Sequence, residues 1–551
     1  MISQHTGNWK TIAQSAQEDL RAKIPSEWRL EDDLITSSIS NVSDVISKSK
    51  ILSESELMMT SVGDATELLV HLRTGEWSAE ATMRVFCKRA ALAHQLVNCL
   101  TAIRFNEAID AARKLDNHLK STGSPMGPLH GLPLSVKDHL NVTGERSTGG
   151  YCMFADNIAT SDSVLVKALQ DAGAIVFVKT TMPVTGMIFE TISNLWGRTV
   201  SPYNRSLTCG GSSGGKGALI ALRGSMIGIG SDIGGSIRIP CAFNGIYGLR
   251  PTAKRLSFQG GVSVHKGQIA IPAVVGPMAH SVRGLDLFCR VATQAKPWYL
   301  DVNVVAMDWK TMPTIGRKLV IGVMKSDGVV RPHPPILDAL DKAEATLKAA
   351  GHDVIRFEPY QSQRCWDILY PLYYPTGGKE MAAALAVTGE PWPVAAKKMS
   401  NAPSLREPTV TELFELHAAR DEYKMEYLHH WNSTAQTSDS GQLMDALLCP
   451  VSASTSFPHD FLPWWGYTSQ FNILDYPGIT LPVGVVDKDL HPKDSAYVPM
   501  NEIDEENHHL YDPNVYHQMP IALQLVGRPY EDEKLLAVAT IIDRELNKGN
   551  I

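Results

Sequence analysis

One stretch of the sequence, from Cys209 to Arg238, carries two serine turns that glycines enclose. The first turn reads GGSSGG at 210–215, the second reads GGS at 234–236, and an apolar segment long enough for a helix and a strand separates them. Because glycine adopts positive φ angles and tolerates close contacts, such turns can direct backbone N–H groups toward a bound group. This pattern is typical of a phosphate cradle or of an oxyanion hole.

Known phosphate-binding motifs do not match either turn. A Walker-type loop has serine or threonine after its lysine, whereas glycine follows Lys216, and neither turn fits GxGxxG. The GxSxG motif of α/β-hydrolases is also absent around Ser236. These departures favour acyl transfer, in which one serine attacks and backbone amides hold the oxyanion. Lysine can activate a serine when burial keeps its amine neutral, and Lys137 stands among apolar residues near the end of a predicted strand.

Predicted helices and short β-branched strands alternate around these residues. The run from 162 to 232 predicts a helix, a strand, a second helix and a second strand. Each serine turn stands in a loop or at the start of a helix. Upstream, Ser78 is expected to cap a helix that Gly75 separates from the preceding one. This alternation indicates a sheet with helices on its faces and a site outside the C-terminal strand ends.

Composition and charge exclude several classes of function. The formal net charge is −7 and no tract of Lys and Arg occurs, so charge gives no reason to bind nucleic acid or an anionic membrane. The sequence lacks a signal-peptide pattern and an apolar run of ~18 residues, and we therefore expect a cytoplasmic protein. Eight cysteines without a CxxC pair favour reduced thiols over a disulfide frame or a zinc site.

Several segments make the chain resemble the amidase signature family, and within it the fungal acetamidase-type branch. The specific ones are GPLHGLPLSVKD, GGSSGG before an alanine-rich helix, GSDIGGSIRIPCAFNGIYGLRPT, DYPGITLPVG and ALQLVGRP. Softer matches such as SEWRL, ILSESEL and VVRPHPPIL extend the resemblance over nearly the whole chain. The resemblance implies an α/β fold with a large mixed β-sheet and helices on both faces, and an enzyme that hydrolyses linear amides.

Carried to this sequence, the resemblance implies a Ser-Ser-Lys triad. Lys137 is then the general base, Ser212 the bridging serine and Ser236 the nucleophile, with a non-proline cis peptide between Gly211 and Ser212. A proton passes from Ser236 through Ser212 to neutral Lys137 while Ser236 attacks the amide carbonyl. Water later releases a carboxylic acid from the acyl-serine, so this mechanism needs no metal and no cofactor.

The same resemblance implies the groups around the triad. Oxyanion and substrate contacts are expected from Ile233, Gly234, Gly235, Ser236, Met187 and Ser212. Ser213 is interpreted as a supporting hydroxyl, and Asp232 with Arg238 as an opposite-charge pair that fixes the nucleophile turn. Phe189 and Trp196 are weaker pocket candidates.

Three residues in the central stretch have less obvious roles. Lys216 departs from the family, in which glutamate is usual at this position, and we expect its side chain to point to solvent or to pair with an unidentified acid. Cys209 and Cys241 lie near the serines, but small buried thiols are the better interpretation for both.

The chain is divided as an N-terminal helical arm over 1–60, with a Ser-rich linker near 37–55, and a single amidase signature domain over 61–551. A helical, aromatic insertion at about 360–435 is expected to form part of the pocket wall, and 487–515 to be an exposed excursion. The aromatic residues expected around the pocket are Trp366, Tyr370, Tyr373, Tyr374, Trp392, Trp464 and Trp465.

The predicted function is hydrolysis of a small, acetamide-like carboxamide to a carboxylate and ammonia. Carbamate esters and larger aryl or fatty amides are the alternatives. The volume of the pocket decides among these substrates, and a sequence does not give that volume. A scaffold or a transamidase subunit is disfavoured, since all three relay residues are present. The expected partner is a small-molecule amide, without nucleic acid or membrane, and a homodimer is an expectation from the family alone.

Overall fold

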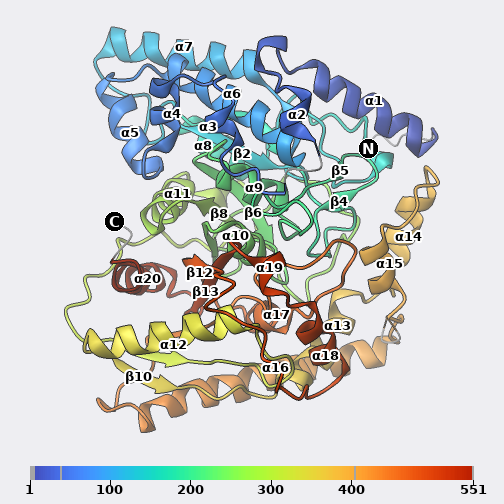
Figure 1. Cartoon of the computed structure of the whole chain (residues 1–551), viewed down its shortest axis with the longest axis vertical. Helices are drawn as coiled ribbons and strands as arrows, with labels where there is room; N and C mark the ends of the chain where they lie inside the picture. Colours follow the sequence, from blue (N-terminus) through green and yellow to red (C-terminus); the bar gives the residue numbers. More distant parts are fainter. Residues whose placement is uncertain (1–6, 37–39, 403–404, 549–551) are drawn as a thin grey trace.

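A computed structural model describes residues 7–36, 40–402 and 405–548 of the chain. Its centre is a mixed β-sheet of eleven strands (Figure 1), which confirms the expected α/β class with a large mixed sheet. In spatial order the strands are β1 (Leu100–Ile103), β3 (Ile175–Thr180), β2 (Pro133–Lys137), β6 (Ile227–Asp232), β8 (Val274–Ala279), β7 (Tyr247–Arg250), β12 (Gly478–Val485), β13 (Pro520–Val526), β11 (Ala446–Pro450), β9 (Val320–Val323) and β10 (Asp353–Arg356). A separate hairpin pairs β4 (Ile192–Ser193) with β5 (Gly197–Arg198).

Two neighbouring strands of this sheet carry the predicted site. Strands β2 and β6 run parallel, with Val136 opposite Ile229, so their C-terminal ends lie side by side. Lys137 is the last residue of β2 and Asp232 the last of β6. Helix α9 (Gly214–Ala221) follows the first serine turn and packs on both strands, whereas α10 (Arg238–Asn244) follows the second turn. The sheet therefore brings the lysine and both turns to one edge.

The N-terminal helices cover one end of the sheet, at the top of Figure 1. They are α1 (Trp9–Ala22), α2 (Asp32–Ile35), α3 (Val45–Lys48), α4 (Glu54–Ser61), α5 (Ala65–Thr74), α6 (Ala79–Val97), α7 (Phe105–Thr122) and α8 (Val164–Asp171). Ser78 caps α6 as predicted, because its side chain accepts the N–H of Ala81, and Gly75 ends α5 in the left-handed region.

The expected Ser-rich linker near 37–55 is wrong for the residues that the structure describes. Residues 37–39 lie outside the described part, but 40–55 include α3 and the start of α4, which Ser53 begins with a capping box. Val42 and Ile46 are buried in the main hydrophobic core. Apolar residues spaced among the serines therefore anchor this segment.

The remaining helices surround the second half of the sheet. They are α11 (Val282–Gln294), α12 (Pro334–Ala349), α13 (Ser362–Tyr373), α14 (Lys379–Ala386), α15 (Val394–Ser400), α16 (Val410–Asn432), α17 (Gly466–Leu474), α18 (Glu502–Leu510), α19 (Pro513–Tyr516) and α20 (Asp532–Leu546), with 3-10 turns η1 (Ser26–Trp28), η2 (Cys152–Phe154), η3 (Pro297–Tyr299) and η4 (Ser433–Gln436). The segment of the predicted insertion contains α13 to α16, and aromatic residues of these helices belong to a second buried cluster.

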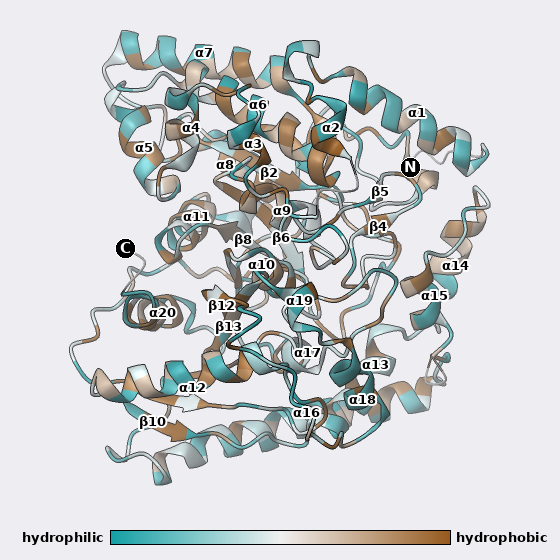
Figure 2. Cartoon of the chain, in the orientation of Figure 1, coloured by the Kyte–Doolittle hydropathy of each residue, from teal (hydrophilic) through white to brown (hydrophobic). Residues whose placement is uncertain are grey.

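Burial follows the hydropathy pattern. Figure 2 shows hydrophobic residues on the central strands β2, β12 and β13, while outer helices such as α1 alternate hydrophilic and hydrophobic residues. The predicted excursion at 487–515 is mostly exposed, as expected, but it also contains α18 and buries Asp504, whose carboxylate accepts the N–H of Arg331 at 2.8 Å. Within the described residues, no helix combines the length and the apolar character needed to cross a membrane.

Candidate active site

The side chain of Lys137 lies in a cluster of hydroxyl groups. Its Nζ atom is 2.7 Å from Ser212 Oγ, 2.9 Å from Ser213 Oγ and 2.9 Å from Ser231 Oγ. The residue is fully buried. Burial lowers the pKa of Lys137 to about 7, although the charges of Asp232 and Asp138 act in the opposite direction. A neutral amine has two hydrogens and one lone pair, so it can donate to two of these hydroxyls and accept from the third.

Ser231 is a part of this cluster that sequence reasoning missed. It is the residue before Asp232 at the end of β6, one strand away from Lys137. The signal that could have found it is the strand pairing, since parallel pairing of β2 with β6 places Ser231 beside the end of β2. The turn serines were found because their glycine pattern is local, whereas Ser231 depends on register.

The first serine turn is packed tightly against the segment before it. The predicted cis peptide between Gly211 and Ser212 is present. A Cβ placed on Gly211 would lie 2.6 Å from the carbonyl oxygen of Ile188, so a larger residue cannot stand here without moving the backbone. The hydroxyl of Thr191 donates to the carbonyl of Gly210 at 2.9 Å and accepts the N–H of Gly214. The segment that contains Ile188 and Thr191 is therefore packed against and hydrogen-bonded to the first serine turn.

The second turn is organised by a buried ion pair. The Asp232 carboxylate accepts the N–H groups of Gly235 at 2.8 Å and Ile237 at 3.1 Å, and it pairs with Arg238 at 3.1 Å. Both charged side chains are buried. Burial raises the pKa of Asp232, but the charge and hydrogen bonds of Arg238 and a hydrogen bond from Asn472 outweigh it and hold this pKa well below its usual value. The expected Asp232–Arg238 contact is thus present.

Two hydroxyl groups orient the carbonyls of this turn. Tyr373 donates to the carbonyl of Ile233 at 2.8 Å, and Thr468 donates to that of Gly234 at 2.6 Å. A trans peptide points its C=O and N–H in opposite directions, so the N–H of Gly234 faces away from Tyr373. Gly235 has φ of 131°, and a Cβ there would lie 2.3 Å from Thr468 Oγ1. The turn consequently requires glycine at this position.

These contacts decide which amides are available to an oxyanion. Across the residues that the structure describes, the N–H groups of Ile233, Gly234 and Ser236 have no acceptor in the protein. The N–H of Gly235, which we expected in the oxyanion hole, donates to Asp232 instead. The arrangement offers three uncommitted donors, with Gly235 holding the turn in shape.

The two serine turns are joined through their backbones. The N–H of Ser213 donates to the carbonyl of Ser236 at 3.1 Å. Ser212 reaches Lys137 directly, whereas within the described part of the chain no hydrogen bond connects the hydroxyls of Ser212 and Ser236. Of the two contacts that the predicted relay needs, the described residues therefore form the one between Lys137 and Ser212 and not the one between Ser212 and Ser236.

The expectation that Lys216 points to solvent or pairs with an acid is wrong. Its side chain is fully buried, and a Cβ placed on Gly228 of β6 would lie 2.5 Å from Lys216 Cδ. Its Nζ has no hydrogen-bond partner among the described residues. Burial lowers the pKa of Lys216 well below its usual value, and Lys137 lowers it further. The physical reason is position, because α9 turns this residue toward the sheet.

The neighbouring cysteines fit their predicted interpretation. All eight cysteines are free and buried. Burial raises the pKa of Cys241 well above its usual value, and Asp232 raises it further, which disfavours the thiolate that attack would need. The pKa of Cys209 is also raised, chiefly by burial. Within the described residues, no group of His, Cys, Asp or Glu has the arrangement of a metal site.

Aromatic side chains pack together near the second turn. Phe189 lies 5.4 Å from Trp465 between ring centroids, and Trp366 lies 4.6 Å from Trp464 and 4.7 Å from Trp465. Tyr373 of α13 reaches the turn itself through Ile233. Phe189, Tyr373, Trp464 and Trp465 belong to one buried cluster, and Met187 and Trp366 pack against it. Trp392 packs both against this cluster and against a separate one around Tyr151, and Trp196 lies in the main core.

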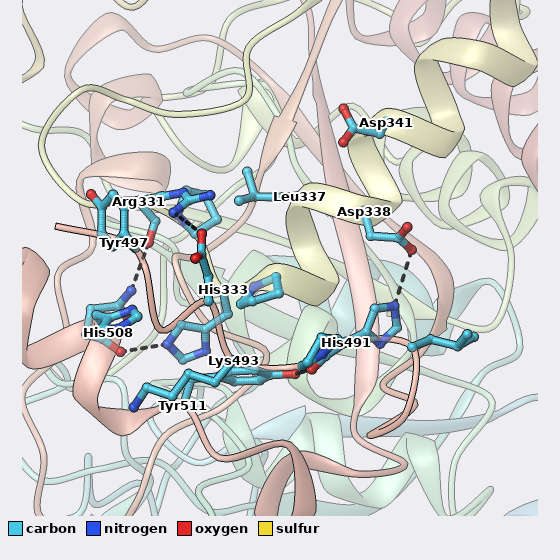
Figure 3. Close-up of a pocket in the computed structure, with 16 residues that line it drawn as sticks. Arg331, His333, Leu337, Asp338, Asp341, His491, Lys493, Tyr497, His508 and Tyr511 are labelled. Atoms are coloured by element: carbon cyan, nitrogen blue, oxygen red, sulfur yellow. Dashed lines mark hydrogen bonds and ion pairs between the residues drawn. The ribbon is translucent and has the colours of Figure 1, made fainter. Parts of the chain in front are cut away.

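A cavity of about 460 Å³ lies elsewhere, where the start of α12 meets the 487–515 excursion. Figure 3 shows Arg331, Tyr497 and His508 on one side of it and Asp338 and Asp341 on another. Several of its polar groups bond within the protein: Arg331 with Asp494 at 3.0 Å, His491 with Asp338 at 3.2 Å, and His333 with the carbonyl of Asn507 at 2.8 Å. No triad residue lines it.

Comparisons with known proteins agree with this fold. The family model described as Amidase matches residues 81–536. Acetamidases from Aspergillus oryzae and Emericella nidulans are 38% and 37% identical over 98% and 99% of this chain, and over 99% of each relative. A solved structure named fatty acid amide hydrolase superposes with a TM-score of 0.91 at 34% identity, covering 98% of this chain and 95% of that one.

These likenesses, together with the mixed sheet and its serine turns, define a hydrolase that acts on amides. The chain belongs to the amidase signature family.

Proposed function

We propose that the protein hydrolyses a small carboxamide, with Lys137, Ser212 and Ser236 as a proton relay and an acyl-Ser236 intermediate. The observation that carries this proposal is the buried Lys137 amine, 2.7 Å from Ser212 Oγ and with a pKa lowered to about 7 by burial. An amine with this pKa is about half neutral at neutral pH, so it can accept a proton. An ordinary lysine would be almost fully charged.

The reaction follows from the positions of these groups. Ser236 Oγ attacks the amide carbonyl as its proton passes to Ser212 and that of Ser212 passes to Lys137. The free N–H groups of Ile233, Gly234 and Ser236 stabilise the oxyanion, each such donor being worth about 3 kcal/mol. The protonated relay then returns a proton to the leaving nitrogen, which departs as ammonia. Water attacks the acyl-serine by the same route and releases the carboxylate.

Aromatic side chains pack close to the turn, since a Cβ placed on Gly234 would lie 2.9 Å from Tyr373 Oη and 3.8 Å from Phe189 Cζ. The names of similar proteins bear on the size of the acyl group. Two similar fungal proteins are named acetamidases, which favours acetamide-like substrates. The similar structure named fatty acid amide hydrolase keeps larger amides as the alternative, together with aryl amides and carbamate esters.

The direct test is hydrolysis of acetamide, benzamide, a long-chain fatty amide and ethyl carbamate by the purified protein. The reaction is measured through the ammonia released or, for the ester, through the ethanol. We expect acetamide to have the highest kcat/KM, and Ser236→Ala to lose activity by a factor of about 10⁴ or more. Cleavage of none of these compounds, or an active Ser236→Ala variant, would refute the proposal. Better cleavage of the fatty amide would leave the relay intact and correct the substrate.

A second experiment tests the relay itself with a fluorophosphonate, which labels an activated serine. We expect labelling at Ser236 that slows strongly in Lys137→Ala, because the neutral amine draws the proton away through Ser212. Undiminished labelling in that variant would show that Lys137 does not activate Ser236.

The cytoplasmic location and the homodimer stay predictions. The rival role, a transamidase subunit, predicts a copurifying partner and a requirement for glutamine, whereas a free amidase releases ammonia from simple amides alone.

A further inference from the structure

The segment from Thr185 to Glu190, which we call the strap, links the predicted substrate pocket to the first serine turn. It contains Met187 and Phe189, and a Cβ on Gly211 would lie 2.6 Å from the carbonyl oxygen of Ile188. Thr185 has φ of 74°, which is costly for a β-branched residue and persists only when neighbouring groups hold it. The position of the strap therefore depends on its anchors.

The first anchor is His265, from the loop between β7 and β8. Its Nε2 atom is 3.2 Å from the carbonyl oxygen of Thr185, and its Nδ1 atom is 2.9 Å from the carboxylate of Glu380 on α14. Thr376 donates a further hydrogen bond to Glu380. Burial raises the pKa of Glu380, but the hydrogen bonds from His265 and Thr376 outweigh it and lower this pKa to about 2. Glu380 is therefore ionised at every pH at which an enzyme assay is run.

The second anchor is His459, at the opposite end of the strap. Its Nδ1 atom is 2.8 Å from the carboxylate of Glu190, and its Nε2 atom is 3.0 Å from the carbonyl oxygen of Arg205. The Glu190 side chain is fully buried and also pairs with Arg198 at 2.9 Å. It accepts the N–H of Asp460 at 2.8 Å. Glu190 therefore fixes the C-terminal end of the strap, between Phe189 and Thr191 in the sequence.

Both histidines share one unusual property. Carbonyl and carboxylate oxygens only accept hydrogen bonds, and each histidine places both ring nitrogens on such oxygens. A neutral imidazole has one N–H, so it can make one of the two bonds, whereas the imidazolium makes both. The bonds that hold the strap at Thr185 and at Glu190 are therefore complete only when the histidines are charged.

Charged and titratable groups lie near both anchors. Besides Glu380, the groups near His265 are Lys266, which is next in the chain, and the buried Tyr151, whose hydroxyl lies near Thr185 and feels the charge of Glu380. Around His459, Arg198 pairs with Asp460 as well as with Glu190.

We propose that His265 and His459 are positioning residues that clamp the strap in its substrate-binding shape through hydrogen bonds at both ring nitrogens. The proposal rests on the proposed function, because it assigns the strap to the pocket of that site. Removal of either imidazole releases the carbonyl of Thr185 or of Arg205, and the strap loosens beside Met187 and Phe189. Substrate binding, and not the chemical step at Ser236, then weakens.

The kinetic test compares wild type with His265→Gln and Glu380→Gln, with acetamide as substrate. We expect His265→Gln to raise KM about tenfold, the factor that one hydrogen bond to a charged group sustains, with kcat within about twofold of wild type. Glu380→Gln removes the carboxylate that holds His265 Nδ1, so its KM should rise in the same direction.

A matched control is His71→Gln. His71 also pairs with a glutamate, Glu76 at 2.8 Å, but on α5 and far from the strap in sequence. We expect no change in KM. A His265→Gln variant whose KM stays at the wild-type value, whether or not its kcat falls, would overturn the clamp. His459→Gln should act in the same direction as His265→Gln, and failure of that variant to fold leaves the His265 experiment decisive.

Hydrogen exchange of a peptide that covers the strap provides a readout without substrate. Protection of the amides of 185–190 should fall in His265→Gln relative to wild type. Unchanged protection in this variant would overturn the clamp whether or not any amide is cleaved. Loss of protection in a protein that hydrolyses no tested amide would instead retain the clamp and refute the proposed function.

Discussion

Replacement of Ser231 by alanine tests the role of the hydroxyl cluster around Lys137. Ser231 Oγ lies 2.9 Å from Lys137 Nζ and is one of three hydroxyls in contact with it. Hydroxyl oxygens that accept from the ammonium stabilise the charged form, so removing one lowers the pKa of Lys137. A hydrogen bond to a charged group is worth about 1.5–3 kcal/mol, and about 1.4 kcal/mol corresponds to one pKa unit.

The expected shift is therefore at least about one pKa unit downward, from the wild-type value of about 7. The wild-type rate should rise about tenfold per pH unit below pH 7 and level off above it, because only neutral Lys137 accepts the proton. Ser231→Ala should reach its plateau about one unit earlier. That plateau should be several-fold lower, since a less basic amine is a weaker proton acceptor.

The assay is the pH dependence of kcat at saturating acetamide, which separates this effect from the KM effect expected of the strap. Ser257→Ala is a suitable control, because Ser257 is equally buried but donates to Asp301 and does not touch Lys137. A midpoint that stays near pH 7 or moves upward in Ser231→Ala would refute the reasoning. So would a wild-type rate that does not change between about pH 5 and 8, since Lys137 would then not titrate as the base.

Three further predictions follow from buried groups of the same region. Lys216→Met should raise the free energy of unfolding by about 1–3 kcal/mol in urea denaturation, because a buried amine without a hydrogen-bond partner is replaced by an apolar thioether of similar length. A loss of stability would contradict this account. Gly235→Ala should lower kcat about a hundredfold or more, since φ of 131° and a contact at 2.3 Å with Thr468 Oγ1 leave no room for Cβ. Gly316→Ala, with open space around it and no positive φ, should keep full activity. Asp232→Asn should lower the free energy of unfolding by about 3–5 kcal/mol, because Arg238 stays buried without its carboxylate. Thermal or urea unfolding measures this loss. A loss under about 1 kcal/mol would show that the hydrogen bonds to Asn472 and Gln524 suffice for Arg238.

The part of the site that sequence predicts best is local in the chain. Ser212, Gly235 and Ser236 stand in a contiguous glycine-rich motif, and the cis peptide at Gly211–Ser212 accompanies it. Lys137 was found because it ends a recognisable strand. The catalytic roles themselves stay predictions until activity is measured.

The part that sequence could not predict depends on contacts between distant residues. Ser231 meets Lys137 across 94 positions, Tyr373 meets Ile233 across 140, and Thr468 meets Gly234 across 234. No local pattern marks these hydroxyls, because each is placed by strand pairing or helix packing. Lys216 shows the opposite error, since a charged residue was assigned to solvent although α9 turns it inward.

The parallel pairing of β2 with β6 has a consequence for how activity is lost on heating. A shift of one residue in this pairing would turn the side chain of Lys137 to the other face of the sheet. Both strands lie inside the sheet, each with neighbours on both sides. Fraying at the sheet edges, at β1 or β10, leaves this register intact. Lys137 should therefore keep its position as long as the middle of the sheet stays folded. Loss of activity on heating should then coincide with cooperative melting of the whole core.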